Sequence, residues 1–354
     1  MNYKEYFLPY TSEIDKFLAR FFQSKIKQSK KITPVASEMW QKLEDFIAGG
    51  KRIRGGLVRL GYECFGGKNK KVILPVSVAI EITNAAILIH DDIIDQVDLR
   101  HGRPTVHRQY QKYHKVYYQK GNSLHYGECM AMMVGDIGMY EAIGLINRSN
   151  FSEKLKLRAI GELIDFMVKT AYGENLDVDL AYREKVTEKD IEIVNIYKTA
   201  YYTLVGPLKI GGILGGATNE QLDGFEDYGV PIGLAFQLQD DILGMFGTVE
   251  KLGKPVDSDI KEGKNTLLYT QALKKGNSSQ RKRLTNLWGK RDITPDEVEE
   301  AKEIIKNTGS LEYSQKLARR LVEKGKKVVP KITKNKNLQE VFLNLADYII
   351  KREK

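Results

Sequence analysis

Apolar residues recur at helical spacing along almost the whole chain, and this periodicity limits the fold more than any other feature. In the segment IEITNAAILIHDDIID the apolar positions are Ile80, Ala85, Ile87, Leu88 and Ile89. A second long helical pattern covers residues 151–185, whereas no series of strands with alternating apolar and polar residues is present. Only nine prolines interrupt the 354 residues. The spacing therefore predicts an all-α fold.

Helix ends are marked by local signals, and the breaks between helices are short. Thr294 is an N-cap, Pro295 follows at the first helical position, and Glu297 completes a capping box in a helix that Gly309 ends. Residues 29–37 join two early helices. No composition shift marks a domain boundary, so we expect a single domain over residues 1–354.

A glycine-rich apolar segment, LVGPLKIGGILGGA, covers residues 204–217. It is too short to span a membrane, which takes about 20 apolar residues, and it contains Lys209. We expect its glycines to allow close helix packing. No run approaches that length, and residues 1–10 are polar and aromatic. The expectation is a chain with no signal peptide and no transmembrane segment.

The chain carries 56 basic and 46 acidic residues, a net charge of +10. This charge suits a polyanionic partner such as nucleic acid, anionic lipid or a phosphorylated small molecule. The excess is diffuse, so we expect no nucleic-acid binding. The two cysteines, Cys64 and Cys129, have no motif spacing. A reducing interior, the cytoplasm, is therefore the expected compartment.

The stretch HDDIIDQVDLRHGRP places four acids, Asp91, Asp92, Asp95 and Asp98, directly after an apolar run. Like charges this close repel one another and destabilise a helix. Each helical residue advances about 100°, so Asp91 and Asp95 share a face, with Asp98 close to the same line. Such a density of oxygen ligands suits Mg²⁺, which takes one or two carboxylates together with substrate phosphates. A solvated acidic helix end is the alternative for this cluster alone.

A second acidic cluster changes the balance between these interpretations. The segment AFQLQDDILG places Asp240 and Asp241 after another apolar run, with Gln237 one turn earlier. A basic loop follows at once, and its lysines are Lys251, Lys254, Lys261 and Lys264. Acids that hold metal, followed by lysines that hold phosphate oxygens, are what a metal-bridged diphosphate requires.

A third element, GGKRIRGG, is a basic turn with glycines on both sides. Lys51 and Arg54 are three residues apart and can share one face. Basic pairs at this spacing are common on exposed helices, so the element is weak alone. Beside two acidic clusters, it indicates a second anion site that needs no metal.

Taken in order, GGKRIR, HDDIIDQVDLRHGRPTVH, YKT (Tyr197 to Thr199) and FQLQDDILG with LGKPVDSDIKEGKNTL resemble the motifs of one family. The chain is similar to trans-isoprenyl diphosphate synthases of the polyprenyl synthetase family, and in particular to geranylgeranyl diphosphate synthases. The resemblance covers roughly residues 40–350, which leaves residues 1–39 as an N-terminal helix and connector. It implies a helical bundle of the isoprenoid synthase type around a central cavity, a homodimer, and three Mg²⁺ ions per site.

The resemblance also implies roles for individual residues. The metal ligands would be Asp91, Asp92, Asp95, Asp240 and Asp241. The allylic diphosphate would be gripped by Arg100, Lys198, Lys254 and Lys264, assisted by Thr199 and Gln237. Isopentenyl diphosphate would be held by Lys51 and Arg54, with Asn84 and His101 at the same subsite. The catalytic set would be Asp91, Asp92, Asp95, Lys198, Asp240 and Lys254. Glu174 and Asp177 stand where the family commonly has residues that face the cavity.

The implied reaction is head-to-tail prenyl transfer. Metals and cations stabilise the departing diphosphate, so that the allylic C–O bond can ionise. The double bond of isopentenyl diphosphate attacks the cation, and a proton is then lost to the released diphosphate. The product is a longer all-trans prenyl diphosphate. In the family, the residues four and five before the first aspartate, here Ile87 and Ala86, form the floor that sets chain length. Because Ala86 is small, we expect a geranylgeranyl or longer product.

Three positions depart from the family pattern. Asn84 stands where members often carry His or Gln, and an Asn has a shorter reach. His101 replaces a second arginine and can be neutral at pH 7, which removes a fixed charge. These two changes affect the subsite of the second substrate. Gly244 stands where many members have a third aspartate of the second motif.

Three other functions compete with prenyl transfer. An HD-type phosphohydrolase fits the HDD at residues 90–92 but gives no reason for the lysine loop. A terpene cyclase shares the DDxxD helix but ionises one substrate, whereas GGKRIR and the lysine loop favour two diphosphates. An inactive partner subunit of a heteromeric synthase would tend to lose its acidic motifs, and both are present here.

Overall fold

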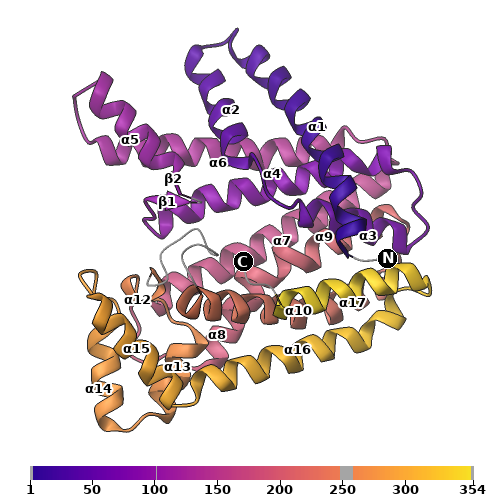
Figure 1. Ribbon diagram of the computed structural model, residues 1–354. Coiled ribbons are helices and arrows are strands. Elements are labelled where there is room, and N and C mark those ends of the chain that lie inside the picture. The colour runs from indigo at the N-terminus through magenta and orange to yellow at the C-terminus, as the bar shows by residue number, and fades with distance from the viewer. Residues whose placement is uncertain (1–2, 101, 248–257, 352–354) are drawn as a thin grey trace. The chain divides into compact units, whose positions relative to one another are not determined.

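The computed structural model describes residues 3–100, 102–247 and 258–351, and nearly all of them are helical. The all-α prediction is confirmed. The chain divides into two compact units, residues 1–163 with 207–218, and residues 164–206 with 219–354. A single domain over residues 1–354 stays a prediction. Figure 1 shows the elements with the labels used below.

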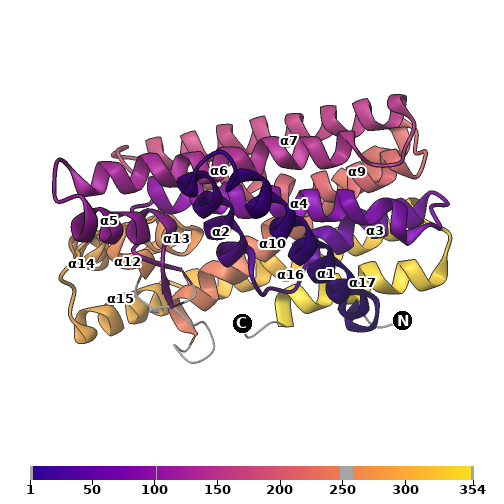
Figure 2. The same ribbon diagram turned by 90° about the horizontal axis from the view of Figure 1, so that it is seen from above.

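The described part of the first unit contains six whole helices, nearly all of a seventh and the beginning of an eighth. Its helices are α1 (Tyr3–Ser29), α2 (Pro34–Ile47), α3 (Ile53–Cys64), α4 (Lys70–Ile94), α5 (Val106–Tyr117), α6 (Ser123–Asn147), α9 (Gly206–Leu214) and the start of α7 (Glu153–Leu180). Helices α4 and α6 run side by side, and α3 packs against α4 (Figures 1 and 2). About half of α4 is buried, so this helix forms the core of the unit.

The second unit is organised around α10. Its elements are the end of α7, α8 (Glu188–Val194), η1 (Asn195–Val205), α10 (Asn219–Phe246), α12 (Ser258–Lys261), α13 (Leu267–Lys275), α14 (Ser278–Leu287), α15 (Pro295–Asn307), α16 (Ser310–Ile332) and α17 (Lys336–Lys351). Helix α10 packs against α16 and η1. A Cβ at Gly233 would lie 2.4 Å from the Cβ of Ala200, so the glycine lets η1 come close.

The predicted helix ends at residues 294–309 and the connector after residue 29 are confirmed. The Thr294 side chain accepts a hydrogen bond from the Glu297 N–H, and the Glu297 carboxylate accepts one from the Thr294 N–H, so the predicted capping box is present. Pro295 begins the helix, and Gly309 follows its end with φ 70°. The early connector lies between Ser29 and Pro34, as expected.

The acidic helix ends earlier than its spacing predicted. Helix α4 stops at Ile94, Asp95 caps it, and Gln96 has a positive φ of 53°. A short antiparallel pair follows, β1 (Leu99–Arg100) and β2 (Arg103–Pro104). The placement of Asp98 near the Asp91/Asp95 line is therefore wrong, because Asp98 lies beyond the helix and pairs with Arg108 at 2.5 Å.

The glycine-rich segment that contains α9 packs directly on α3. A Cβ at Gly211 would lie 2.0 Å from the backbone oxygen of Val58, and one at Gly61 would lie 2.2 Å from the backbone oxygen of Leu208. Real Cβ atoms essentially never approach other atoms so closely. The prediction that the glycines of residues 204–217 allow close helix packing is confirmed.

Two described helices, α4 and α6, are long and apolar enough by composition to cross a membrane. In α4, 67% of the apolar window is buried inside the protein, which is typical of a core helix. In α6 the buried share is 39%, so this helix leaves much of its apolar surface uncovered.

Candidate active site

The first acidic cluster lies at the end of the core helix α4. The backbone N–H of Asp95 donates to the carbonyl of Asp91 at 2.8 Å, which keeps these two residues one helical turn apart. Asp91 and Asp95 are half-buried, and Asp92 between them is 1% exposed. The predicted grouping of three carboxylates is therefore present within the first unit.

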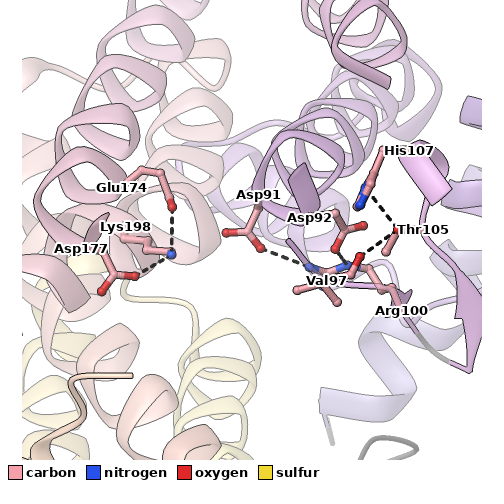
Figure 3. Close-up of polar contacts among 9 residues, drawn as sticks. All are labelled: Asp91, Asp92, Val97, Arg100, Thr105, His107, Glu174, Asp177 and Lys198. Atoms are coloured by element: carbon pink, nitrogen blue, oxygen red, sulfur yellow. Dashed lines mark hydrogen bonds and ion pairs between the residues drawn. The ribbon is translucent and has the colours of Figure 1, made fainter. Parts of the chain in front are cut away.

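Arg100, from β1, binds this cluster. Its Nε donates to Asp92 Oδ1 at 2.7 Å, and its Nη2 donates to Asp91 Oδ2 at 3.1 Å (Figure 3). The hairpin therefore carries a guanidinium back to two carboxylates of the preceding helix. The family resemblance implies that Arg100 binds a diphosphate, whereas in this structure it pairs with the aspartates.

The carboxylate of Asp92 is buried beside two other negative charges. Burial raises the pKa of Asp92 to about 6, while Arg100 acts in the opposite direction and the charges of Asp91 and Asp95 add to the rise. Asp92 Oδ2 is buried and has no hydrogen-bond partner among the residues that the structure describes. A buried carboxylate oxygen without a hydrogen-bond partner, next to two more carboxylates, is suited to bind a divalent cation.

The residues before the cluster pack against neighbouring helices. His90 lies on Gly135 of α6, with its Nε2 3.1 Å from the Met132 carbonyl. Ala86 is fully buried, and Ile87 is half-buried. Asn84 is half-buried, and within the described part of the chain its buried Oδ1 has no hydrogen-bond partner.

The basic turn precedes α3 in the same unit. Lys51 is exposed and Arg54 is half-buried. Between them, Arg52 is buried and adopts a left-handed backbone with φ 51°, and Gly49 and Gly50 also have positive φ. The Lys51 carbonyl accepts a hydrogen bond from Thr11 Oγ1 of α1 at 3.2 Å, which ties the turn to that helix.

In the second unit, Lys198 lies on the π-helical segment η1. Its Nζ is 2.7 Å from Asp177 Oδ2 and 3.0 Å from Glu174 Oε2, both on α7 (Figure 3). A Cβ at Gly173 would lie 2.2 Å from the Lys198 backbone nitrogen, so α7 and η1 meet at backbone distance. The two acids are thus the groups that hold the Lys198 ammonium.

A hydrogen-bonded chain joins η1 to the second acidic cluster on α10. Thr199 Oγ1 donates to Gln237 Oε1 at 3.0 Å, and Gln237 Nε2 donates to Asp241 Oδ1 at 2.8 Å. The structure therefore brings together three residues that sequence analysis assigned to the same site. Asp240, next to Asp241, is half-buried.

Asp241 and Asp259 are buried, and the half-buried Lys264 interacts electrostatically with both. Burial, and then the charge of Asp259, raises the pKa of Asp241 to about 7. Burial lowers the pKa of the Lys264 amine, but Asp259, and after it Asp177 and Asp241, outweighs that effect, so this pKa lies above its ordinary value. Lys264 thus stays protonated among carboxylates, which is a state suited to binding an anion.

Asp259 is a residue that sequence analysis missed. It is buried, and a Cβ at Gly244 would lie 3.0 Å from its Oδ2. The space beside the position where many family members carry a third aspartate is therefore used by another carboxylate. A signal was available, because Asp259 lies five residues before Lys264 in the same loop motif. His101 and Lys254, both assigned to substrate, lie outside the described residues.

The protein is almost entirely helical and has two aspartate clusters. Each cluster lies beside a basic side chain, Arg100 at the first and Lys264 at the second. These are features of enzymes that bind metal-bridged diphosphates. Comparisons with known proteins agree. A family model described as polyprenyl synthetase matches residues 37–305. The chain is 35% identical to a short chain isoprenyl diphosphate synthase of Methanothermobacter thermautotrophicus over 306 residues, 86% of this chain and 87% of the relative.

Two further relatives extend the comparison. A geranylgeranyl diphosphate synthase of Methanosarcina mazei is 33% identical over 307 residues, 86% of this chain and 87% of the relative. A crystal structure of geranylgeranyl pyrophosphate synthase from Corynebacterium glutamicum, complexed with isoprenyl diphosphate and magnesium, is 28% identical with a TM-score of 0.91. The match covers 96% of this chain and 98% of that one. The chain belongs to the polyprenyl synthetase family and is a prenyltransferase.

Proposed function

We propose that the protein condenses isopentenyl diphosphate with an allylic diphosphate to give a longer all-trans prenyl diphosphate. The observation that carries this proposal is the pair of aspartate clusters, each beside a cation that carboxylates hold. Asp91 and Asp92 pair with Arg100 in one unit, and Asp241 lies with Lys264 and Asp259 in the other. That both clusters serve one bound diphosphate remains part of the proposal.

The chain's own residues divide the work of binding between them. Asp91, Asp92, Asp95, Asp240 and Asp241 hold Mg²⁺, with three ions per site. Bound Mg²⁺ neutralises the leaving diphosphate so that the allylic C–O bond can ionise. Arg100, Lys198, Lys254 and Lys264 bind the allylic diphosphate, and Thr199 and Gln237 orient it. The second substrate binds at Lys51 and Arg54, and we assign Asn84 and His101 to the same subsite. Binding there holds its double bond close enough to attack the allylic cation.

We infer a geranylgeranyl or longer product. The small, fully buried Ala86 five residues before Asp91 supports this length, with Ile87 beside it. Relatives named geranylgeranyl and geranylfarnesyl diphosphate synthases support the same range. Ala86 and Ile87 together form the proposed floor of the chain pocket.

Incubation with Mg²⁺, isopentenyl diphosphate and farnesyl diphosphate, followed by chromatography of the products, tests the function. We expect a prenyl diphosphate of twenty or more carbons, and none when EDTA removes the metal. A terpene cyclase would instead consume farnesyl diphosphate without isopentenyl diphosphate. An inactive partner subunit would give no product alone, and either result would refute the proposal.

We further propose a cytoplasmic homodimer. Apolar side chains are exposed on α6 and along α7: Met132, Met133, Tyr140, Leu157, Ile164, Val168 and Tyr172. On α7 their spacing of seven, four and four residues forms one helical stripe. Exposed apolar patches of this kind mark association sites, and symmetric dimers are the commonest assembly. The free thiols Cys64 and Cys129 support a reducing compartment.

A further inference from the structure

A buried carboxylate interrupts the apolar surface of α4 well before the acidic cluster. Glu81 is 6% exposed, in a helix whose neighbouring residues are mostly apolar. Ser77 and Asn84 lie four residues before it and three after it, so the three share one face. A buried carboxylate is costly unless hydrogen bonds and opposite charge compensate it, so its partners indicate what it does.

Glu81 holds the beginning of α3. Its Oε1 accepts a hydrogen bond from the backbone N–H of Gly55 at 2.7 Å. This N–H lies in the first turn of α3, where N–H groups have no partner within the helix. A carboxylate there is favourable also because the amino end of a helix carries partial positive charge. Glycine at position 55 permits this approach, because a Cβ there would lie 3.0 Å from the backbone oxygen of Ser77 and 3.3 Å from Glu81 Cγ.

Glu81 also attracts the basic turn that leads into α3. Its Oε2 lies 4.0 Å from Arg52 Nη1, and the Arg52 side chain is 6% exposed. Arg52 Nε donates on its other side to Asp15 Oδ1 at 2.8 Å. Burial raises the pKa of Glu81, while the Gly55 N–H and the charges of Arg54 and Arg52 act in the opposite direction.

The backbone of Arg52 explains why this attraction matters. Its left-handed conformation costs an ordinary residue about 1–2 kcal/mol. Arg52 is the N-cap of α3 and makes no side-chain capping bond. The turn therefore keeps this conformation because buried groups hold it, and Arg52 is drawn inward while its neighbour Lys51 stays exposed.

We propose that Glu81 is a positioning residue for isopentenyl diphosphate: it fixes the turn at residues 49–55 so that Lys51 and Arg54 are preorganised as an anion site. This inference depends on the proposed function, in which these two cations bind the second substrate. A preorganised site binds more tightly because less conformational freedom is lost when the ligand arrives.

If Glu81 acted only as a negative charge near the anion site, its neutralisation would change isopentenyl diphosphate binding in the opposite direction. A negative charge near an anion site weakens anion binding, so neutralising a mere background charge would strengthen it. Neutralising a positioning residue loosens the turn and weakens binding. The sign of the change in the KM for isopentenyl diphosphate therefore separates the two roles.

The test compares steady-state kinetics of the full-length Glu81→Gln variant with those of wild type. Gln keeps the shape and an oxygen acceptor for the Gly55 N–H but removes the charge that attracts Arg52. We expect the KM for isopentenyl diphosphate to rise about ten-fold, which is about 1.4 kcal/mol of binding. The KM for farnesyl diphosphate and kcat should stay within about two-fold of wild type, because binding alone is affected.

Glu63→Gln is the matched control. Glu63 of α3 also contacts α1, because Tyr6 Oη donates to its Oε2 at 2.8 Å, and its Oε1 accepts from Arg59 Nε of the same helix at 2.7 Å. It does not touch the basic turn through these contacts, so its neutralisation should leave both KM values unchanged. Thermal unfolding of both variants shows how much stability each one loses.

Arg52→Gly is the second test variant, for use also where Glu81→Gln does not fold. Glycine adopts the left-handed conformation freely but lacks the guanidinium that Glu81 attracts. We expect the same selective rise in the KM for isopentenyl diphosphate. An unchanged or lowered KM, or an equal rise for both substrates, overturns the positioning role. A wild-type protein that makes no prenyl product refutes the proposed function instead.

Discussion

At the scale of single residues, Ala86 has the most specific consequence. Ala86 is fully buried, and a Cβ added at Gly138 of α6 would lie 3.1 Å from the Cβ of Ala86. Two small residues thus meet where α4 and α6 pack together. A large side chain at position 86 must take space either from this contact or from the pocket for the growing chain.

We therefore expect Ala86→Phe to shorten the product, toward fifteen carbons or fewer, with a stability loss of about 1–3 kcal/mol from overpacking. Chromatography of the dephosphorylated products measures the length, and thermal unfolding measures the stability. Ala301→Phe is the control, since Ala301 is equally buried but belongs to a core cluster of the second unit. An unchanged product length in Ala86→Phe would make the proposed floor wrong.

The residues of the candidate site were predictable where a motif contains them. Gln237, Thr199 and Asp241 came from short motifs, and the structure joins them in one hydrogen-bonded chain. Asp259 and Glu81 were not predicted. Asp259 lies within the quoted loop motif, so a signal for it was available. The role of Glu81 depends on a contact with another helix, which spacing along one segment does not encode.

At the scale of the elements, the approach of α3 to α9 makes the clearest prediction. Gly61→Ala places a Cβ 2.2 Å from a backbone oxygen that no side-chain rotation can move away. We expect a loss of about 1–3 kcal/mol in the free energy of unfolding, from overpacking. Denaturant unfolding measures this change.

Gly224→Ala is the matched control within α10. A Cβ there would lie 3.5 Å from Ile332 Cγ1, which is ordinary contact. Alanine is favoured over glycine inside a helix by about 0.5–1 kcal/mol, so this variant should be as stable as wild type or more so. If both variants behaved alike, close packing would not be the reason for glycine at position 61.

Helices were predictable from periodicity, but two irregular elements were not. The π-helical turns of η1 place Lys198 against α7, yet a π-helix has no apolar spacing of its own to reveal it. The hairpin of β1 and β2 involves two residues in each strand, too few for an alternating pattern. Both elements carry cations of the candidate site, Lys198 and Arg100.

At the scale of the whole molecule, the exposed apolar side chains of α6 (Met132, Met133 and Tyr140) predict self-association. Tyr140→Lys places a charge on an apolar surface that a second copy would cover. We expect the dimer to dissociate at least ten-fold more readily, as measured by sedimentation at several protein concentrations. Tyr182→Lys is the control, because Tyr182 is the most exposed large apolar side chain among the described residues, yet it lies beyond the end of α7.

A wild-type protein that sediments as a monomer at all concentrations would refute the dimer.

The fold class, family and enzyme class were predictable at this scale because the ordered motifs extend over most of the chain. Division into two compact units was not, because no change of composition separates them and helix α7 belongs to both.

The pairing of Arg100 with Asp91 and Asp92 makes metal binding an exchange rather than a simple addition. A divalent ion that takes these carboxylates must displace a guanidinium already bound there. The affinity measured for the ion is then the difference between two attractions. The displaced guanidinium becomes available to an incoming anion, so at this aspartate cluster the binding of each ligand favours the binding of the other.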